Sequence, residues 1–276
     1  MDNLIETKEI GNYRINVFYD VNAICPCVDY DMVAYYLWEY SRCNRLSDVC
    51  NWKEVFGKFG DSRHSLIESL QELIKDYVEW EDLLQYFKDK KLSNYRLRCD
   101  DEKKYHLEWY NKRKDTFIEL FCEDSIVLNN MSFIVDFIEH LNKDELIQII
   151  NDLGKDIIVK EWSSTGYCQG DYVEGIAFCT KDRYQKMVDT DTTNWKEKVE
   201  LFIDAGAEIV GMWMWGDIKG FTLEEKVTYT KKYDNPERED EKSYEWEEID
   251  SCCGYYMKTD ELIEEVINEH ELMEVA

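Results

Sequence analysis

The stretch YEWEEIDSCCGYY, residues 244–256, decides how the last part of the chain folds. Aromatic and aliphatic side chains alternate with acidic ones over residues 244–251, which is typical of a β-strand with two different faces. Gly254 comes next, and glycine tolerates backbone angles that other residues avoid. The stretch therefore predicts a strand that ends in a turn at Gly254, with the pair Tyr255 and Tyr256 packed inward.

The region around this strand is predicted to be mostly β. We expect strands over residues 157–162, 172–179, 208–215, 227–233 and 244–251, the last three in one antiparallel sheet, with an exposed turn at 234–240. Short helices are expected at 181–188 and 195–205. Thr259 is the expected cap of a final helix, whose apolar stripe Leu262, Ile263, Val266 and Ile267 alternates with acidic residues.

The first half is predicted to contain more helix than the second half. Residues 13–19 alternate as a strand does, and the apolar run 31–40 is a buried strand or a helical turn, with its β-branched and aromatic content favouring the strand. A helix capped by Asp61 or Ser62 is expected next, then helices at 80–90, 132–141 and 143–153, the last ended by Gly154. Residues 23–29 are expected to form a loop, 105–114 a helix or a hairpin arm, and 117–127 a strand.

These patterns predict an α+β fold with a helix-rich first half and an antiparallel sheet with flanking helices in the second half. We divide the chain into a mixed, helix-rich region 1–154 and an acidic α+β region 155–276. The sequence leaves open whether one sheet joins the two regions.

Charge is distributed unevenly along the chain. The formal net charge is −27, from 33 Lys and Arg against 60 Asp and Glu. Residues 234–276 contain 16 of these acidic residues but only Arg238, Lys242 and Lys258 as cations. Such a surface repels nucleic acid and anionic membranes, and it attracts a strongly basic partner. No apolar run is long enough to span a bilayer, and Met1 to Glu6 is acidic and unlike a signal peptide, so a cytoplasmic protein with reduced cysteines is expected.

Several short blocks resemble a family of uncharacterised phage and mobile-element proteins. They are an early block at 20–26, a glycine-rich turn at 166–171, the segment Gly216-Asp217-x-x-Gly220-Phe221, and Asp250-Ser251-Cys252-x-Gly254-Tyr255-Tyr256. The resemblance covers about residues 13–40 and 157–267. This chain differs from the family pattern at Cys253, at Phe221 and in the position of Pro26. The resemblance implies a mobile-element origin and no particular activity.

No catalytic, metal or cofactor site is predicted. Cys252 follows Asp250 and Ser251, with His270 as the nearest base in sequence, but an acidic neighbourhood raises the pKa of a thiol instead of activating it. The pairs Cys25-x-Cys27 and Cys252-Cys253 lack zinc-site spacing. Asp29 and Asp31 are candidate ligands for Mg²⁺ or Ca²⁺, without the spacing of an EF-hand loop.

The leading hypothesis is an inhibitor of a host nucleic-acid-binding defence protein, acting through an acidic surface that mimics nucleic acid. Its expected partner contacts are Glu245, Glu247, Glu248, Asp250, Glu261, Glu264 and Glu265. The partner would be a nuclease or other protein with a basic groove. Two alternatives stay open: a metal-dependent enzyme acting on a nucleotide or defence signal, and an accessory protein that self-associates into a homo-oligomer.

Overall fold

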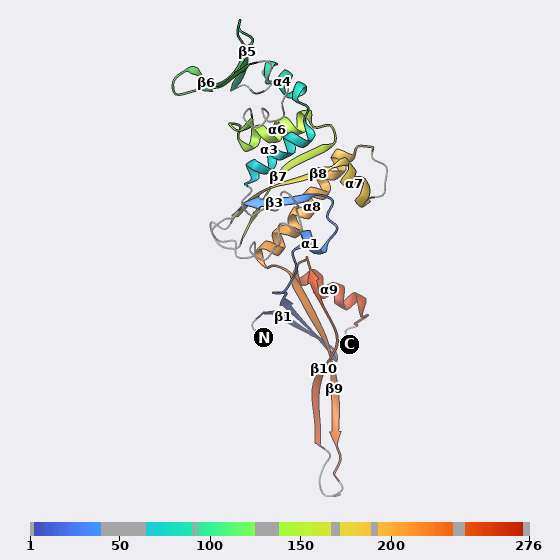
Figure 1. Ribbon diagram of the computed structural model, residues 1–276. Coiled ribbons are helices and arrows are strands. Elements are labelled where there is room, and N and C mark those ends of the chain that lie inside the picture. The colour runs from blue at the N-terminus through green and yellow to red at the C-terminus, as the bar shows by residue number, and fades with distance from the viewer. Residues whose placement is uncertain are drawn as a thin grey trace. The chain divides into compact units, whose positions relative to one another are not determined.

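The computed structural model describes residues 3–39, 65–89, 92, 94–124, 138–166, 172–188, 193–233 and 241–272 (Figure 1). These residues contain seven helices and ten strands in three antiparallel sheets, so the predicted α+β class is confirmed. They form two compact units. The terminal unit is built from residues 3–29 and 209–272, and the central unit from residues 30–208. The boundary expected at residue 154 stays a prediction.

The terminal unit combines the two ends of the chain in one sheet, in the order β1-β2-β9-β10. Its elements are β1 (Leu4–Ile10), β2 (Tyr13–Tyr19), α1 (Pro26–Asp29), β9 (Lys219–Lys231), β10 (Glu241–Tyr255) and α9 (Thr259–Glu269). β2 pairs with β9, from Tyr13 opposite Glu225 to Tyr19 opposite Lys219. The loop expected at 23–29 was wrong for its last four residues, which form the short helix α1 beginning at a proline.

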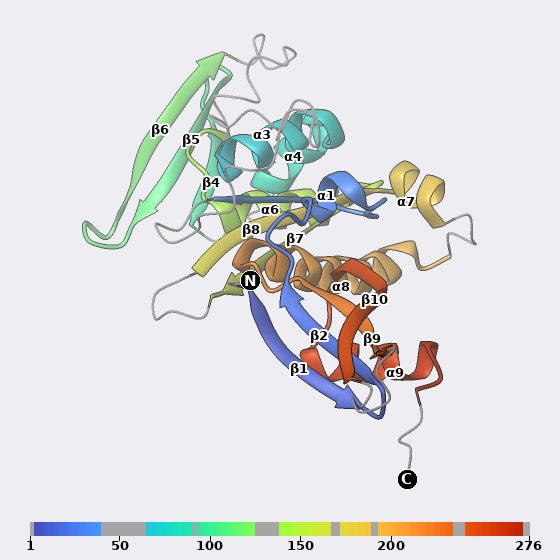
Figure 2. The ribbon, with the colours of Figure 1, turned by 90° about the horizontal axis from the view of Figure 1, so that it is seen from below.

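One face of this sheet is covered by α9 (Figure 2). Its buried residues Leu262, Ile263 and Val266 share an apolar core with side chains of β2 and β9, namely Ile15, Val17, Phe221 and Leu223. This core is what holds the acidic helix against the strands. At the end of β10, Gly254 has φ +87°, which confirms the special backbone conformation predicted there.

The β9–β10 hairpin continues past the other two strands (Figure 1). Pairing of β9 with β2 ends at Glu225, and residues 226–231 then pair only with residues 241–246 among the described strands. We call residues 226–231 and 241–246 the arm. Most of its side chains are exposed, because none of the described helices or strands forms a second layer over it.

The central unit contains the sheet β3-β8-β7 and the helices packed with it. Its elements are β3 (Tyr35–Glu39), β7 (Ile157–Thr165), β8 (Tyr172–Thr180), α3 (Leu66–Tyr77), α6 (Lys143–Leu153) and α7 (Lys181–Val188), together with most of α8 (Trp195–Trp215). α3 begins with a capping box in which Ser65 accepts from the backbone N–H of Glu68. The predicted cap residues 61 and 62 lie outside the described part of the chain.

α8 corrects one prediction. Residues 208–215 were expected to be a strand, but they continue the helix that begins at Trp195. Val210, Trp213 and Met214 are the buried residues, and their spacing of three and four is helical. The run resembles a buried strand in sequence because Ile209, Met212 and Trp215, which are not among the buried residues, are also large and apolar.

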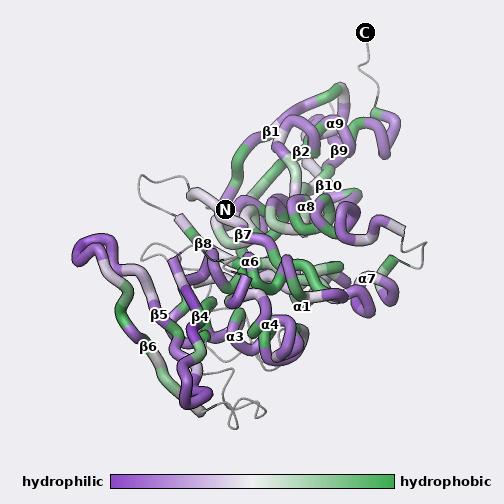
Figure 3. The backbone as a smooth tube through the Cα atoms, turned by 90° about the horizontal axis from the view of Figure 1, so that it is seen from above, coloured by the Kyte–Doolittle hydropathy of each residue, from purple (hydrophilic) through white to green (hydrophobic). Residues whose placement is uncertain are grey.

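A second sheet of the central unit has the order β4-β5-β6 (Figure 2). Its strands are β4 (Tyr95–Cys99), β5 (Lys104–Asn111) and β6 (Thr116–Asp124), and α4 (Trp80–Lys88) contacts β4. Of the two alternatives for residues 105–114, the hairpin is therefore correct. The turn between β5 and β6 is hydrophilic (Figure 3), with the sequence Lys112-Arg113-Lys114-Asp115.

Other predictions are not shown by the structure or lie outside the described residues. The described portion of residues 1–154 holds six strands beside four helices, so the helix-rich first half is not shown. The turn at 234–240 and most of the helix predicted at 132–141 lie outside the described residues. Within the described ranges, no helix is both long and apolar enough to cross a membrane.

Candidate functional site

All seven carboxylates predicted as partner contacts lie in the terminal unit. Glu245, Glu247, Glu248 and Asp250 are on β10, and Glu261, Glu264 and Glu265 are on α9. Six of them are exposed, and Asp250 is half-buried. Both elements belong to the packed part of the unit or extend directly from it, so the carboxylates have a fixed scaffold.

The strand register decides which carboxylates of β10 share a face. Glu245 lies opposite Val227 and Glu247 opposite Glu225, on the side of the sheet that α9 covers. A β-bulge then follows Glu248, so Asp250 returns to this same side, opposite Leu223. Glu248 lies opposite Glu224 and therefore faces the other way.

On α9 the acidic residues form one stripe. Leu262, Ile263 and Val266 face the sheet, so Glu264 and Glu265 project on the outer side of the helix. Glu261 lies in the first turn, and its carboxylate accepts the backbone N–H of Lys258 at 3.2 Å. The helix carboxylates and Glu245, Glu247 and Asp250 thus lie on the same side of the sheet.

None of the seven carboxylates forms an ion pair with a described lysine or arginine. The Tyr229 hydroxyl donates to Glu247, and this hydrogen bond is the main cause that raises the pKa of Tyr229. The Ser251 hydroxyl donates to Glu248 at 2.8 Å. Asp250 Oδ2 lies 2.9 Å from Nε2 of His270. The negative charge of the seven carboxylates is therefore largely uncompensated by lysine and arginine side chains.

On the opposite face of the sheet, cationic side chains contact the acidic and aromatic ones. Arg14 Nε donates to Glu224 at 2.6 Å, and Asn16 donates to the same carboxylate oxygen at 2.8 Å. The Arg14 guanidinium lies 4.6 Å from the centre of the Trp246 ring, and the Lys226 ammonium lies 4.1 Å from the centre of the Tyr244 ring. These two cations therefore offset charge on this face and do not contact Glu245 or Glu247.

The cysteine pair at the end of β10 has no sign of activation. Burial raises the pKa of the Cys253 thiol, and the charge of Asp20 raises it further. His270 contacts Asp250 instead of either sulfur. A nucleophilic cysteine needs the opposite environment, in which a nearby base or cation stabilises the thiolate.

The central unit contains a cavity of about 740 Å³ beside the C-terminal end of β5 and the start of α6. Its lining combines the rings of Trp109 and Tyr110 with the cations Lys112 and Arg113, and the remaining residues are Asn94, Tyr95, Asn111, Leu120, His140, Asn142 and Glu145. A volume of this size suits a small organic ligand. The mixture of aromatic and cationic side chains is unusual in a chain with so much acidic surface.

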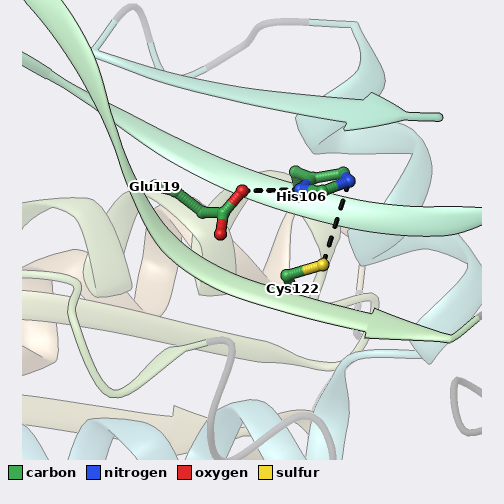
Figure 4. A group of neighbouring side chains, drawn as sticks. All are labelled: His106, Glu119 and Cys122. Atoms are coloured by element: carbon green, nitrogen blue, oxygen red, sulfur yellow. Dashed lines mark hydrogen bonds and ion pairs between the residues drawn. The ribbon is translucent and has the colours of Figure 1, made fainter.

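A second group of chemically active side chains lies on β5 and β6 (Figure 4). His106 is only 9% exposed, and both of its ring nitrogens have partners. Nδ1 lies 2.6 Å from Glu119 Oε2, and Nε2 lies 2.9 Å from Asp100 Oδ2. Cys122 Sγ is 3.8 Å from Nε2.

Local structure fixes these side chains. Asp100 directly follows β4, and its Oδ1 accepts the backbone N–H groups of Glu102 and Lys104 at 2.9 Å each. Cys122 lies directly opposite His106 in the register. A β-bulge at Leu120 brings Glu119 to the same face as Cys122, although the two are three residues apart.

The electrostatics of this group are dominated by the carboxylates. Hydrogen bonds with Asp100 and then Glu119 raise the pKa of His106, against the smaller opposing effects of burial and the charge of Arg98. The hydrogen bond with His106 is in turn the main cause that lowers the pKa of Asp100. Sequence reasoning missed this group because its four members come from a turn and two strands, without any recognisable spacing.

Neither the family models, nor the curated proteins, nor the solved structures include a match to this chain. The arrangement of the residues themselves therefore carries the functional argument.

Proposed function

We propose that the protein is a non-enzymatic binding protein whose terminal unit docks, through the carboxylates of β10 and α9, onto the basic groove of a nucleic-acid-binding protein. The observation that carries the proposal is the set of exposed carboxylates on one side of a packed unit, without partners among the described lysines and arginines. The biological setting implied by the family resemblance, a mobile-element protein that inhibits a host defence protein, belongs to the same proposal.

The spacing of these carboxylates supports mimicry of a polyanion. Residues two apart on a strand are separated by about 6.8 Å, as Glu245 and Glu247 are on β10. Phosphates on one DNA strand are spaced about 3.4 Å along the axis, so this separation matches every second phosphate. Residues four apart on a helix, such as Glu261 and Glu265, are separated by about 6 Å along the axis.

The rigid scaffold supports the same reading. A docking surface loses less conformational entropy on binding when its groups are held in place beforehand. α9 is held by a buried core, and Asp250 is additionally held beside His270. An acidic tail without a core would lack this advantage.

The test compares two triple charge reversals that change the net charge by the same amount. Glu245, Glu264 and Glu265, each replaced by lysine, alter the proposed surface. Asp101, Glu200 and Glu208, which are equally exposed in the central unit, provide the matched control. Proteins retained from a bacterial lysate at low salt are identified for each variant and for the parent chain.

We expect the parent and the control to retain the same basic protein, and the first variant to lose it. Retention should weaken as salt rises, because exposed charges are screened. Duplex DNA added to the retained protein should release it. The proposal is wrong if both variants retain the same set of proteins, or if DNA does not compete.

A second candidate function is favoured by the cavity of the central unit, which suits an anionic ligand with an aromatic ring. Trp109 and Tyr110 could stack on the ring, and Lys112 and Arg113 could hold the anion. Titration with a nucleoside triphosphate, followed by tryptophan fluorescence, tests this function. Arg113→Ala should abolish the signal, whereas Lys155→Ala, which removes another exposed cation of this unit, should leave it unchanged.

A further inference from the structure

We propose that Asp100, His106 and Cys122 form a binding site for a zinc ion, with Glu119 orienting the imidazole. The site lies on the β4-β5-β6 sheet of the central unit and is independent of the acidic docking surface. Its starting point is that one ring nitrogen, Nε2 of His106, faces both a carboxylate oxygen and a sulfur.

The distances are close to those of a tetrahedral site. Zinc bonds of about 2.0 Å to nitrogen and oxygen, and about 2.3 Å to sulfur, place neighbouring ligand atoms about 3.3–3.6 Å apart. Asp100 Oδ2 is 2.9 Å from Nε2, and Cys122 Sγ is 3.8 Å from it. Shifts of about half an ångström therefore bring Asp100 Oδ2 and Cys122 Sγ each to the separation from Nε2 that a bound ion requires.

Glu119 supplies the second feature of a zinc site. A histidine that ligates zinc through one nitrogen usually donates its other N–H to a carboxylate, which fixes the ring and its tautomer. Glu119 Oε2 accepts in this way at 2.6 Å from Nδ1. Nε2 is then the nitrogen that is directed toward the other two ligands.

The chain also holds the ligands in place before an ion arrives. Asp100 is fixed by two backbone N–H groups at its other oxygen, and His106 and Cys122 lie on paired strands. The combination of imidazole, thiolate and carboxylate favours zinc over Mg²⁺ or Ca²⁺, which prefer oxygen ligands alone.

Binding would exchange protons for the ion. Nε2 of His106 and Sγ of Cys122 bind zinc without a proton, so each releases any proton it carries when the ion binds. The charged groups near the His106 ring are Asp100, Glu119 and Arg98. Arg98 Nε also lies 3.6 Å from Glu108 Oε1. Two carboxylates and a thiolate outweigh this one arginine, so the site has a net attraction for a divalent cation.

The experiment measures alkylation of individual cysteines, because other thiols of the chain, such as the exposed pair Cys252 and Cys253, can bind zinc on their own. Reduced protein is treated with iodoacetamide with and without one equivalent of Zn²⁺, and each cysteine is followed by peptide mass spectrometry. We expect zinc to slow alkylation of Cys122 at least tenfold. Exposed Cys99, on the neighbouring strand, should react at an unchanged rate.

Variants connect this protection to the proposed ligands. His106→Gln and Asp100→Asn should each remove the protection of Cys122, whereas His140→Gln, an exposed histidine in the same unit, should keep it. Glu119→Gln changes a half-exposed side chain and so should leave the fold intact. It should weaken zinc affinity by about 10- to 100-fold, as the loss of an orienting carboxylate does.

Three results overturn the proposal. The first is an equal rate of Cys122 alkylation with and without zinc. The second is protection that persists in both His106→Gln and Asp100→Asn. The third is an unchanged zinc affinity in Glu119→Gln, because this result would show that Glu119 does not orient the imidazole.

Discussion

Replacement of Leu262 by alanine tests whether the acidic helix α9 depends on the core beneath it. Leu262 is fully buried and packs against β2 and β9. α9 has only 11 residues, too few for a stable isolated helix in water. Its position, and with it the stripe of Glu264 and Glu265, should therefore depend on this contact.

The expected cost follows from the groups removed. Leu→Ala deletes three carbon groups, worth about 0.8 kcal/mol each in transfer free energy, or about 2.4 kcal/mol together. The cavity that remains raises the total toward the upper end of about 2–5 kcal/mol. Since about 1.4 kcal/mol corresponds to a factor of ten, amide exchange through opening of the terminal unit should accelerate about 50-fold or more.

Hydrogen exchange read by peptide mass spectrometry is the appropriate assay, because the two compact units need not unfold together. Peptides from α9, β2 and β9 should lose protection, while peptides from β7 and β8 should not change. Glu264→Ala, on the outer side of the same helix, is the control and should stay within about 0.5 kcal/mol of the parent. An increase below threefold in α9, or an equal increase in β7 and β8, would refute the reasoning.

Two further predictions follow from groups with shifted pKa values. The hydrogen bond from Arg14 lowers the pKa of Glu224, so the pair stabilises the fold above the unfolded carboxyl pKa of about 4.3 and loses this contribution as pH falls through the lower, folded value. Arg14→Gln should therefore reduce stability at pH 7 and flatten its dependence on acid below pH 5, as measured by denaturant unfolding at several pH values. Burial raises the pKa of Cys179 to about 11. At pH 8, Cys179 in the folded protein should resist iodoacetamide while exposed Cys99 reacts, and modification of both at equal rates would contradict this.

Elements with a strong local period were predictable from sequence. The strand at 13–19 and the helix at 143–153 agree with β2 and α6, because each depends on one face meeting one core. The final helix is also correct, but its cap is Lys258, and Thr259, the predicted cap, is its first residue. The strand predicted at 208–215 failed because an apolar run that is buried on several sides has no clear period.

Long-range pairing could not be predicted in the same way. β2 and β9 are about 200 residues apart in sequence, and nothing in either strand identifies the other as its neighbour. The consequence concerns the proposed docking surface, because this pairing places Arg14 beside Glu224 and so binds a cation on the face opposite Glu245 and Glu247. Counting charges along the chain predicts an acidic region, but only the register shows which side of the sheet stays uncompensated.

Both candidate sites depend on β-bulges, which are the feature least accessible from sequence. Simple alternation would place Glu248 and Asp250 on one face of β10, but the bulge between them puts these carboxylates on opposite faces. On β6 the effect is reversed. Glu119 and Cys122 are three residues apart and would face opposite sides of a regular strand, yet the bulge at Leu120 turns both toward His106. A search for ligands by alternating spacing therefore rejects the pair that the fold brings together. Deleting Leu120 should turn β6 into a regular strand in which Glu119 and Cys122 are two positions apart, so both side chains should still face His106.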